Sequence, residues 1–456
     1  MEMRNIIERQ QSYFKTQVTK SIDYRVQMLK KLKIKILSME EEITEALSKD
    51  LGKSAFESYA AEIGFILKEI GETVKNLKNW MKPQRVKTNI INKPGKSKIY
   101  AEPFGLVLVI APWNYPFQLA ISPMIGAIAA GNCVTLKPSE LSTHTALVLD
   151  KLIKTIFSPE YISCILGGIA ETTALLSEKW DYIFFTGSTA VGKIVMQAAA
   201  KNPTPVTLEL GGKSPCIIDK TADLKVAARR IAWGKWMNAG QTCIAPDYLY
   251  VHETVKDEFV KILIETVREF YTDNPRESKD YGRIISERHF ERLLGLMKHG
   301  QILFGGEMDQ VEKYLSPTII GNVNRQQPIM QEEIFGPLLP ILEFNDIRSV
   351  IDDINKFDKP LALYFFSKEK KTWELILQNV SFGGGCFNDT ISHIINPHLP
   401  FGGVGSSGMG SYHGKKSFDT FSHFKSVYEK PTFFDMKLRY PPYGDKKLKW
   451  LKDFLK

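Results

Sequence analysis

The hydrophobic pattern predicts a helical N-terminal region. Apolar residues recur at i, i+3 and i+4 positions from residue 26 to residue 53, and the pattern stops at Gly52, a residue type that commonly ends helices. A second helical pattern runs from about residue 57 to residue 80. The next segment, 81–98, is polar, contains two prolines and has no helical stripe, so we predict an exposed connection or a paired edge hairpin there.

The pattern changes at Phe104, where short apolar runs begin to alternate with helical stretches. The strand-like runs are 104–112, 132–139, 161–166, 181–187 and 205–210. Helical patterns follow Pro116 and Ser142, and we expect the Ser142 side chain to cap the helix after it. This alternation predicts a doubly wound parallel sheet.

The alternation restarts after Gly211 and Gly212, which indicates a second α/β domain. Strand-like runs at 214–219 and 248–253 are each followed by a helical pattern. The segment 382–414 is rich in glycine and is predicted to be an ordered loop. The expected fold class is therefore α/β, with two doubly wound domains.

Length and composition fit a globular protein of several domains. The chain has 456 residues, of which 43% are hydrophobic and 24% charged, and this excludes a disordered, collagen-like or disulfide-scaffold protein. No stretch of about 20 apolar residues is present, so no membrane-spanning helix is predicted, and the N-terminus lacks the apolar core of a signal peptide. The five cysteines are widely spaced without a CxxC motif, which favours free thiols and a cytoplasmic location.

The positive charge is concentrated at the C-terminus. The net charge is +9, and the last twenty residues hold seven Lys or Arg against two Asp. The rest of the chain is nearly balanced, so we expect no nucleic-acid binding. Leu448, Leu451 and Leu455 give this tail an apolar face. The tail is therefore expected either to pack within a dimer or to contact an anionic membrane surface as a basic amphipathic helix.

Two residues in separate motifs have side chains suited to covalent and acid–base chemistry. Cys243 lies between Gly240 and Pro246 in NAGQTCIAP, and a loop cysteine near backbone N–H groups can be a nucleophile with a lowered pKa. Glu209 ends a strand-like run before two glycines, where desolvation would raise its pKa towards that of a general base. Taken singly, an inert cysteine and a solvated strand-end glutamate also explain these residues.

Other motifs give weaker signals. FFTGSTAVGK, from Phe184 to Lys193, joins a strand to a helix start that can face a phosphate, although it matches neither GxGxxG nor the Walker A spacing. Asn114 in APWNYPF carries an amide able to stabilise an oxyanion. EEIFGP places Glu333 and Phe335 before a Gly-Pro turn. The eight histidines form no metal-binding pattern, so we predict no metal site.

Seven motifs occur in one order over residues 104–425, and together they resemble the aldehyde dehydrogenase superfamily. They are APWNYPF, KPSE, FTGS followed by VG, LELGGKSP, GQTC, EEIFGP and PFGGVGSSGMG. GQTCIAPDY, the late RYPPY and the short N-terminus further resemble the class 3 branch of fatty and aromatic aldehyde enzymes. The resemblance implies a homodimer whose subunits have two domains and a small bridging element, and with the basic tail the chain has four expected parts. These are an NAD-binding domain (1–82 and 102–210), a bridging or oligomerisation element (83–101 and 415–435), a catalytic domain (211–414) and a basic tail (436–456).

The resemblance also implies roles for individual residues. Cys243 matches the nucleophile, Glu209 the general base, and Asn114 the side chain that holds the oxyanion. The residues that match the cofactor site are Lys137 and Glu140 near the adenine ribose, Gly187, Ser188 and Gly192 near the pyrophosphate, and Glu333 and Phe335 at the nicotinamide ribose and ring. Tyr115 and Phe401 are expected to line an aromatic substrate pocket.

The expected reaction is oxidation of an apolar aldehyde, of medium or long chain or aromatic, to a carboxylic acid through a thiohemiacetal and a thioester on Cys243. NAD is the expected cofactor, because a carboxylate such as Glu140 near a ribose 2′-OH repels a 2′-phosphate, and NADP is the alternative because Lys137 is nearby. Two further enzymes are considered: a CoA-acylating enzyme of the same fold, in which Glu209 would be superfluous, and a cysteine hydrolase, which would need a histidine beside Cys243. A non-enzymatic binder would leave Cys243, Glu209 and Asn114 without a role.

Overall fold

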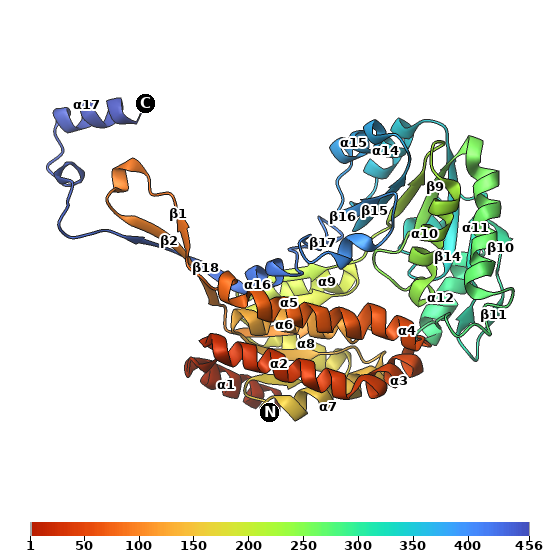
Figure 1. The fold of residues 1–456 in the computed structure, drawn as a ribbon, viewed down its shortest axis with the longest axis horizontal. Coiled ribbons are helices and arrows are strands. Elements are labelled where there is room, and N and C mark those ends of the chain that lie inside the picture. Colours follow the sequence, from red (N-terminus) through yellow and green to blue (C-terminus); the bar gives the residue numbers. More distant parts are fainter. Residues whose placement is uncertain (1, 456) are drawn as a thin grey trace. The chain divides into compact units, whose positions relative to one another are not determined.

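The computed structural model describes residues 2–455 and shows the predicted alternation of helices and strands (Figure 1). The chain forms two compact units, one of Met1–Trp80 with Pro103–His423 and one of Met81–Glu102 with Phe424–Lys456. The first unit contains two separate sheets that are largely parallel, so the prediction of an α/β fold is confirmed.

A six-stranded sheet in the first unit has the strand order β17-β7-β6-β3-β4-β5. Its strands run parallel, apart from β17, which pairs antiparallel with β7. The strands are β3 (Leu106–Ile110), β4 (Cys133–Lys137), β5 (Ile162–Cys164), β6 (Tyr182–Thr186), β7 (Val206–Glu209) and β17 (Gly408–Met409). The chain order reverses between β3 and β6, and ligands of doubly wound sheets bind at the carboxyl ends of the strands beside such a reversal.

Helices cover this sheet and bury its apolar residues. They are α1 (Glu2–Lys15), α2 (Ile22–Ser38), α3 (Glu40–Leu51), α4 (Ala55–Ser58), α5 (Gly64–Trp80), α6 (Gln118–Ala130), α7 (Thr143–Ile156), α8 (Ile169–Ser177), α9 (Thr189–Ala200) and α16 (Lys415–Thr420). Every residue of β3 is buried, as its continuous apolar run predicts. One core cluster joins Leu108, Phe185 and Leu208 of the strands to Val195 of α9 and Ile7 of α1.

Two local expectations for these helices were wrong. The helical pattern of residues 26–53 forms two helices, because Met39 leaves the helical conformation and three glutamates begin a new first turn, where negative charge is favourable. Ser142 occupies the cap position of α7, but its side chain makes no capping bond. The carboxylate of Asp50 accepts the N–H groups of His144 and Thr145 instead, and a charged acceptor binds such groups more strongly than a hydroxyl.

The second sheet of this unit has seven strands in the order β10-β13-β14-β9-β8-β15-β16, and it is parallel except at the edge strand β10. Its strands are β8 (Pro215–Ile218), β9 (Tyr248–His252), β10 (Gln301–Phe304), β13 (Thr318–Gly321), β14 (Leu338–Phe344), β15 (Ala362–Phe366) and β16 (Gly384–Phe387), and a separate pair is β11 (Met308–Asp309) with β12 (Tyr314–Leu315). The helices are α10 (Leu224–Trp236), α11 (Lys256–Tyr271), α12 (Glu287–Met297), α13 (Pro328–Gln331), α14 (Ile347–Asn355) and α15 (Lys370–Asn379). The segment 382–414, expected to be loop throughout, therefore also supplies strands β16 and β17.

The smaller unit contains a three-stranded sheet in the order β1-β2-β18. Its elements are β1 (Gln84–Val86), β2 (Lys96–Pro103), β18 (Ser422–Glu429) and α17 (Asp445–Phe454). The antiparallel pairing of β1 with β2 confirms the edge hairpin, which was one of two expectations for this segment. Within residues 2–455, no helix has both the length and the apolarity needed to cross a membrane.

Candidate active site

A cavity of about 760 Å³ in the first unit brings together four residues from separate motifs, Cys243, Glu209, Tyr115 and Phe401. Most of its remaining wall is apolar and includes Phe65, Leu119, Trp233, Ile391 and Ile394. Sequence reasoning missed these wall residues, because they belong to helices and turns whose apolar positions look like ordinary core. Only the packing of α5, α6 and α10 around one space distinguishes them.

Cys243 follows α10 and a 3₁₀ turn, Met237–Gly240, in which Asn238 and Ala239 have φ near +50°. The turn requires glycine at position 240, because a Cβ there would lie 2.3 Å from the Gly336 carbonyl oxygen. The expectation of a lowered pKa for Cys243 was wrong. Burial raises the pKa of this thiol, and the carboxylates of Glu333 and Glu209 raise it further by repelling the thiolate.

Glu209 is the last residue of β7 and lies opposite Gly408 of β17. Its side chain is 2% exposed, and neither carboxyl oxygen has a hydrogen-bond partner among the described residues. Burial raises the pKa of this carboxyl well above its ordinary value, as its position between two leucines predicts. A carboxyl that is buried without a partner and borders a cavity is well suited to exchange a proton with a molecule that enters.

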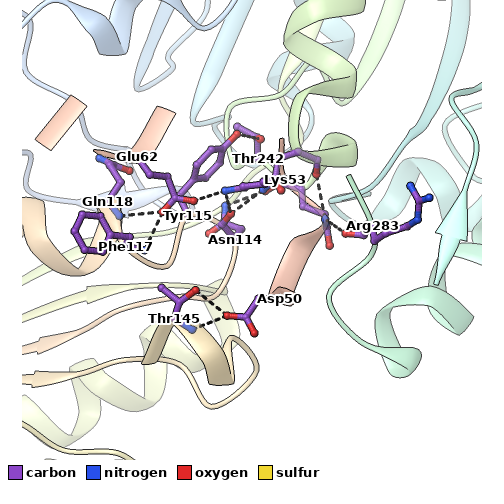
Figure 2. Close-up of polar contacts among 12 residues, drawn as sticks. Asp50, Lys53, Glu62, Asn114, Tyr115, Phe117, Gln118, Thr145, Thr242 and Arg283 are labelled. Carbon is purple, nitrogen blue, oxygen red and sulfur yellow. Dashed lines mark hydrogen bonds and ion pairs between the residues drawn. The ribbon is translucent and has the colours of Figure 1, made fainter. Parts of the chain in front are cut away.

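Asn114 lies in the loop that joins β3 to α6 and is buried. Its Nδ2 donates to the backbone oxygen of Gln241 at 3.0 Å, which uses one of the two N–H groups of the amide (Figure 2). The hydroxyl of the adjacent Tyr115 hydrogen-bonds the Thr242 hydroxyl at 2.7 Å. Gln241 and Thr242 immediately precede Cys243, so both bonds tie the loop of Asn114 to the segment that carries the thiol.

The residues matched to the pyrophosphate are Gly187 and Ser188, which join β6 to α9, and Gly192 in the first turn of α9. The Ser188 hydroxyl accepts the N–H of Val191 at 3.4 Å, so Ser188 is the N-cap of α9. A Cβ at Gly192 would lie 2.6 Å from the side chain of Leu210, the residue after Glu209, so glycine lets this helix pack close to the end of β7. A Cβ at Gly187 would likewise lie 2.5 Å from the Phe185 ring. The helix start is thus held near the carboxyl end of the sheet, where N–H groups can bind phosphate.

Lys137 and Glu140 lie at the carboxyl end of β4. Lys137 is buried, its Nζ donates to the Pro138 oxygen at 2.7 Å, and it lies 3.7 Å from Oε2 of the exposed Glu140. Burial lowers the pKa of Lys137, and the Glu140 carboxylate offsets part of this effect.

Glu333 borders a second, more polar cavity of about 260 Å³, together with Thr189, Gly211, Lys213 and Arg325. A Cβ at Gly211 would lie only 1.9 Å from Oε2 of Glu333. The cavity can therefore hold the Glu333 carboxyl only because residue 211 has no side chain. Burial raises the pKa of Glu333 to about 8.

Phe335 borders neither cavity and packs edge-on against Trp113, with ring centroids 5.3 Å apart. Trp113 immediately precedes Asn114, so this contact places Phe335 beside the loop of the candidate oxyanion amide. Among residues 2–455, no three His, Cys, Asp or Glu side chains are grouped to hold a metal ion.

Comparisons with known proteins agree with these observations. A model of the aldehyde dehydrogenase family matches residues 1–427. The 4,4'-diaponeurosporen-aldehyde dehydrogenase of Staphylococcus aureus is 52% identical, over 99% of this chain and 100% of that protein. The dimeric NADP-preferring aldehyde dehydrogenase of Rattus norvegicus is 48% identical, over 96% of this chain and 97% of the rat protein. A solved substrate-bound state of Staphylococcus aureus AldH has a TM-score of 0.98 at 50% identity, over 100% of this chain and 99% of that chain.

These findings give no support to a CoA-acylating enzyme. The family model covers most of the chain, and relatives near 50% identity extend over almost all of it. The chain therefore belongs to the aldehyde dehydrogenase family and is an oxidoreductase that acts on aldehydes.

Proposed function

We propose that this protein oxidises apolar aldehydes to carboxylic acids with NAD, using Cys243 as nucleophile and Glu209 as general base. One observation carries the proposal: the thiol and the unpartnered carboxyl border the same largely apolar cavity. The wall of Phe65, Trp233 and Phe401 favours straight-chain or aromatic substrates over polar ones.

The chemistry divides between these two residues. The Cys243 sulfur adds to the aldehyde carbon, and the carbonyl oxygen becomes anionic. A fixed amide donor such as Asn114 stabilises that charge by about 3 kcal/mol. Loss of hydride from the resulting thiohemiacetal leaves a thioester on Cys243. Water then attacks the thioester while Glu209 takes its proton. The carbon–sulfur bond breaks, the carboxylic acid departs, and Glu209 returns the proton to the Cys243 sulfur, which restores the thiol.

We assign the dinucleotide to the residues that the sequence motifs indicate. Ser188 and the start of α9 would hold the pyrophosphate, Lys137 and Glu140 the adenine ribose, and Glu333 the nicotinamide ribose. When bound, oxidised nicotinamide supplies the hydride acceptor and a positive ring charge that favours the thiolate. NAD is favoured because the Glu140 carboxylate repels a 2′-phosphate. Among relatives, the rat enzyme is NADP-preferring, whereas a Sinorhizobium meliloti enzyme, 31% identical with a TM-score of 0.82, is NAD-dependent.

The test uses purified full-length protein, NAD or NADP, and a panel of straight-chain and aromatic aldehydes, with reduced dinucleotide followed by absorbance. We expect kcat/KM to rise with the apolar area of the aldehyde, the acid to form without CoA, and a mass increase of one acyl group at Cys243. Cys243→Ala should have no activity. Turnover by this variant, or a strict need for CoA, would contradict the proposal. Thioester cleavage without any dinucleotide would instead support the cysteine hydrolase.

We also propose that the smaller unit mediates a homodimer. Within it, Ile90, Phe433 and Tyr443 have exposed fractions of 70%, 84% and 71%, and most of the edge strand β18 is exposed. Exposed apolar side chains beside a free strand edge are features of a surface that another chain covers. Sedimentation should give twice the chain mass of 51.8 kDa. A monomer that binds anionic vesicles through α17 would favour the membrane alternative.

A further inference from the structure

A fully buried ion pair lies outside both cavities and has no role in the proposed chemistry. It joins Lys53, which follows α3, to Glu62 in the π-helical turn Tyr59–Ile63, and both side chains are 0% exposed. Burying two charges is costly, and a buried pair is often no more stabilising than apolar residues of the same size. Stability alone is therefore a weak explanation for this pair.

The pair contacts the Asn114 loop at Asn114 itself and at the start of α6 (Figure 2). Lys53 Nζ donates to the backbone oxygen of Asn114 at 2.9 Å. Glu62 uses one carboxyl oxygen for Lys53 and the other to accept the N–H groups of Phe117 and Gln118, at 2.9 and 3.1 Å. A single carboxylate thus anchors the start of α6 and orients the ammonium group that binds the Asn114 carbonyl.

The same loop is tied to the segment before Cys243 by independent contacts. Asn238 Nδ2 donates to the Asn114 oxygen at 2.7 Å, so this carbonyl accepts from Lys53 and Asn238 together. The Lys53 ammonium also lies 4.0 Å from the centre of the Tyr115 ring, whose hydroxyl reaches Thr242. The main-chain oxygen of Asn114 and the side chain of the next residue, Tyr115, are therefore fixed by a buried ammonium group and by buried hydrogen bonds.

We infer that Lys53 and Glu62 are positioning residues that hold the Asn114 amide where the oxyanion forms. The inference rests on the proposed role of Asn114. An oxyanion donor acts only if it is already in place when the charge develops, and displacement of a reacting group by about 1 Å can slow a reaction about 100-fold. Glu62→Gln keeps the shape of the side chain but removes the charge that orients Lys53. We expect it to lower kcat for aldehyde oxidation about 10- to 100-fold.

The chain offers a matched control in Asp50, whose contacts with Thr145 are also drawn in Figure 2. Asp50 is buried, and its carboxylate accepts the N–H groups of His144 and Thr145 at 3.1 and 2.8 Å and the Thr145 hydroxyl at 2.7 Å. It therefore anchors the start of α7 as Glu62 anchors α6. Its hydrogen bonds go to α7 and not to the Asn114 loop. Asp50→Asn should lower the thermal midpoint as Glu62→Gln does, with kcat unchanged.

Alkylation of Cys243 by iodoacetamide separates positioning from general damage. In this reaction a sulfur–carbon bond forms, iodide leaves, and no oxyanion develops. Glu62→Gln should therefore keep the wild-type alkylation rate and dinucleotide affinity while kcat falls. Lys53→Arg keeps the positive charge but moves the donor, and provides a second folded variant with an intermediate kcat. An equal loss of alkylation, affinity and kcat would overturn the inference.

A double-mutant comparison with Asn114→Ala tests whether the pair acts through the amide. If it does, Glu62→Gln should lower kcat in the wild-type background but have little further effect when Asn114 is alanine. Equal losses in both backgrounds would overturn the positioning role and leave the proposed function intact. Full activity of Asn114→Ala alone would instead refute the oxyanion role on which the inference rests.

Discussion

Glu209→Gln changes one buried carboxyl into an amide of the same size. We expect it to lower turnover and to raise the thermal stability of the fold. The carboxyl is 2% exposed and its oxygens have no partner among residues 2–455, so the amide loses no hydrogen bond of the described structure. Only the ability to take a proton is removed. The substitution therefore tests the general base without disturbing the packing around it.

The expected loss of turnover follows from the step that needs the base. General bases contribute about 10²- to 10⁴-fold, which corresponds to roughly 3–5 kcal/mol of barrier. Addition of Cys243 and loss of hydride do not require Glu209, whereas hydrolysis of the thioester does. Rapid mixing with aldehyde and NAD should show a burst of about one reduced dinucleotide per active site, followed by a slow steady rate.

The effect on stability follows from the raised pKa of Glu209. A carboxyl whose pKa is higher in the folded than in the unfolded state stabilises the fold below the unfolded pKa, and this stability is lost as the pH rises through the folded pKa. Glutamine does not titrate, so the thermal midpoint of Glu209→Gln should exceed that of the wild type by an amount that grows as the pH rises above 4.5.

Glu69→Gln is the control for replacing a buried carboxyl. Burial raises the pKa of Glu69 from 4.5 to about 7, so its amide variant should gain stability over that pH window, by no more than about 3 kcal/mol, without losing turnover. Wild-type steady-state turnover of Glu209→Gln, or loss of its burst, would refute the assignment of the base. A midpoint that falls relative to wild type as the pH rises would refute the electrostatic argument.

Two further predictions concern the thiol and the cofactor. Burial and the carboxylates of Glu333 and Glu209 raise the pKa of Cys243, so the rate of its alkylation in the ligand-free enzyme should increase up to pH 9 without a plateau. Glu333→Gln should increase this rate at pH 8. A plateau near pH 7 would contradict this environment of the thiol. Glu140→Gln should reduce the preference for NAD over NADP, measured as the ratio of kcat/KM values, because the substitution removes a charge that repels the 2′-phosphate. An unchanged ratio would mean that Glu140 does not lie near the ribose.

The sequence by itself determined the kinds of element and their order. Continuous apolar runs such as 104–112 are typical of strands buried on both faces, and their alternation with helical patterns favours a parallel sheet. The seven ordered motifs identified the family, since each preserves chemistry that depends on short spacing. The raised pKa of Glu209 was also predictable, because its two flanking leucines already indicate desolvation.

The tertiary structure alone decided which distant residues meet. Asp50 replaces Ser142 as the cap of α7, although 92 positions separate them in the chain, because helix packing places a stronger acceptor at the N–H groups. The pKa of Cys243 rises because burial desolvates the thiol and the Glu333 carboxylate repels the thiolate, and neither the burying residues nor Glu333 can be identified from the adjacent sequence. Lys53 and Glu62 contact the Asn114 loop across more than fifty residues. Contacts between distant residues produce no periodic pattern in the sequence, because burial, dielectric environment and hydrogen bonding depend on which groups lie close in space.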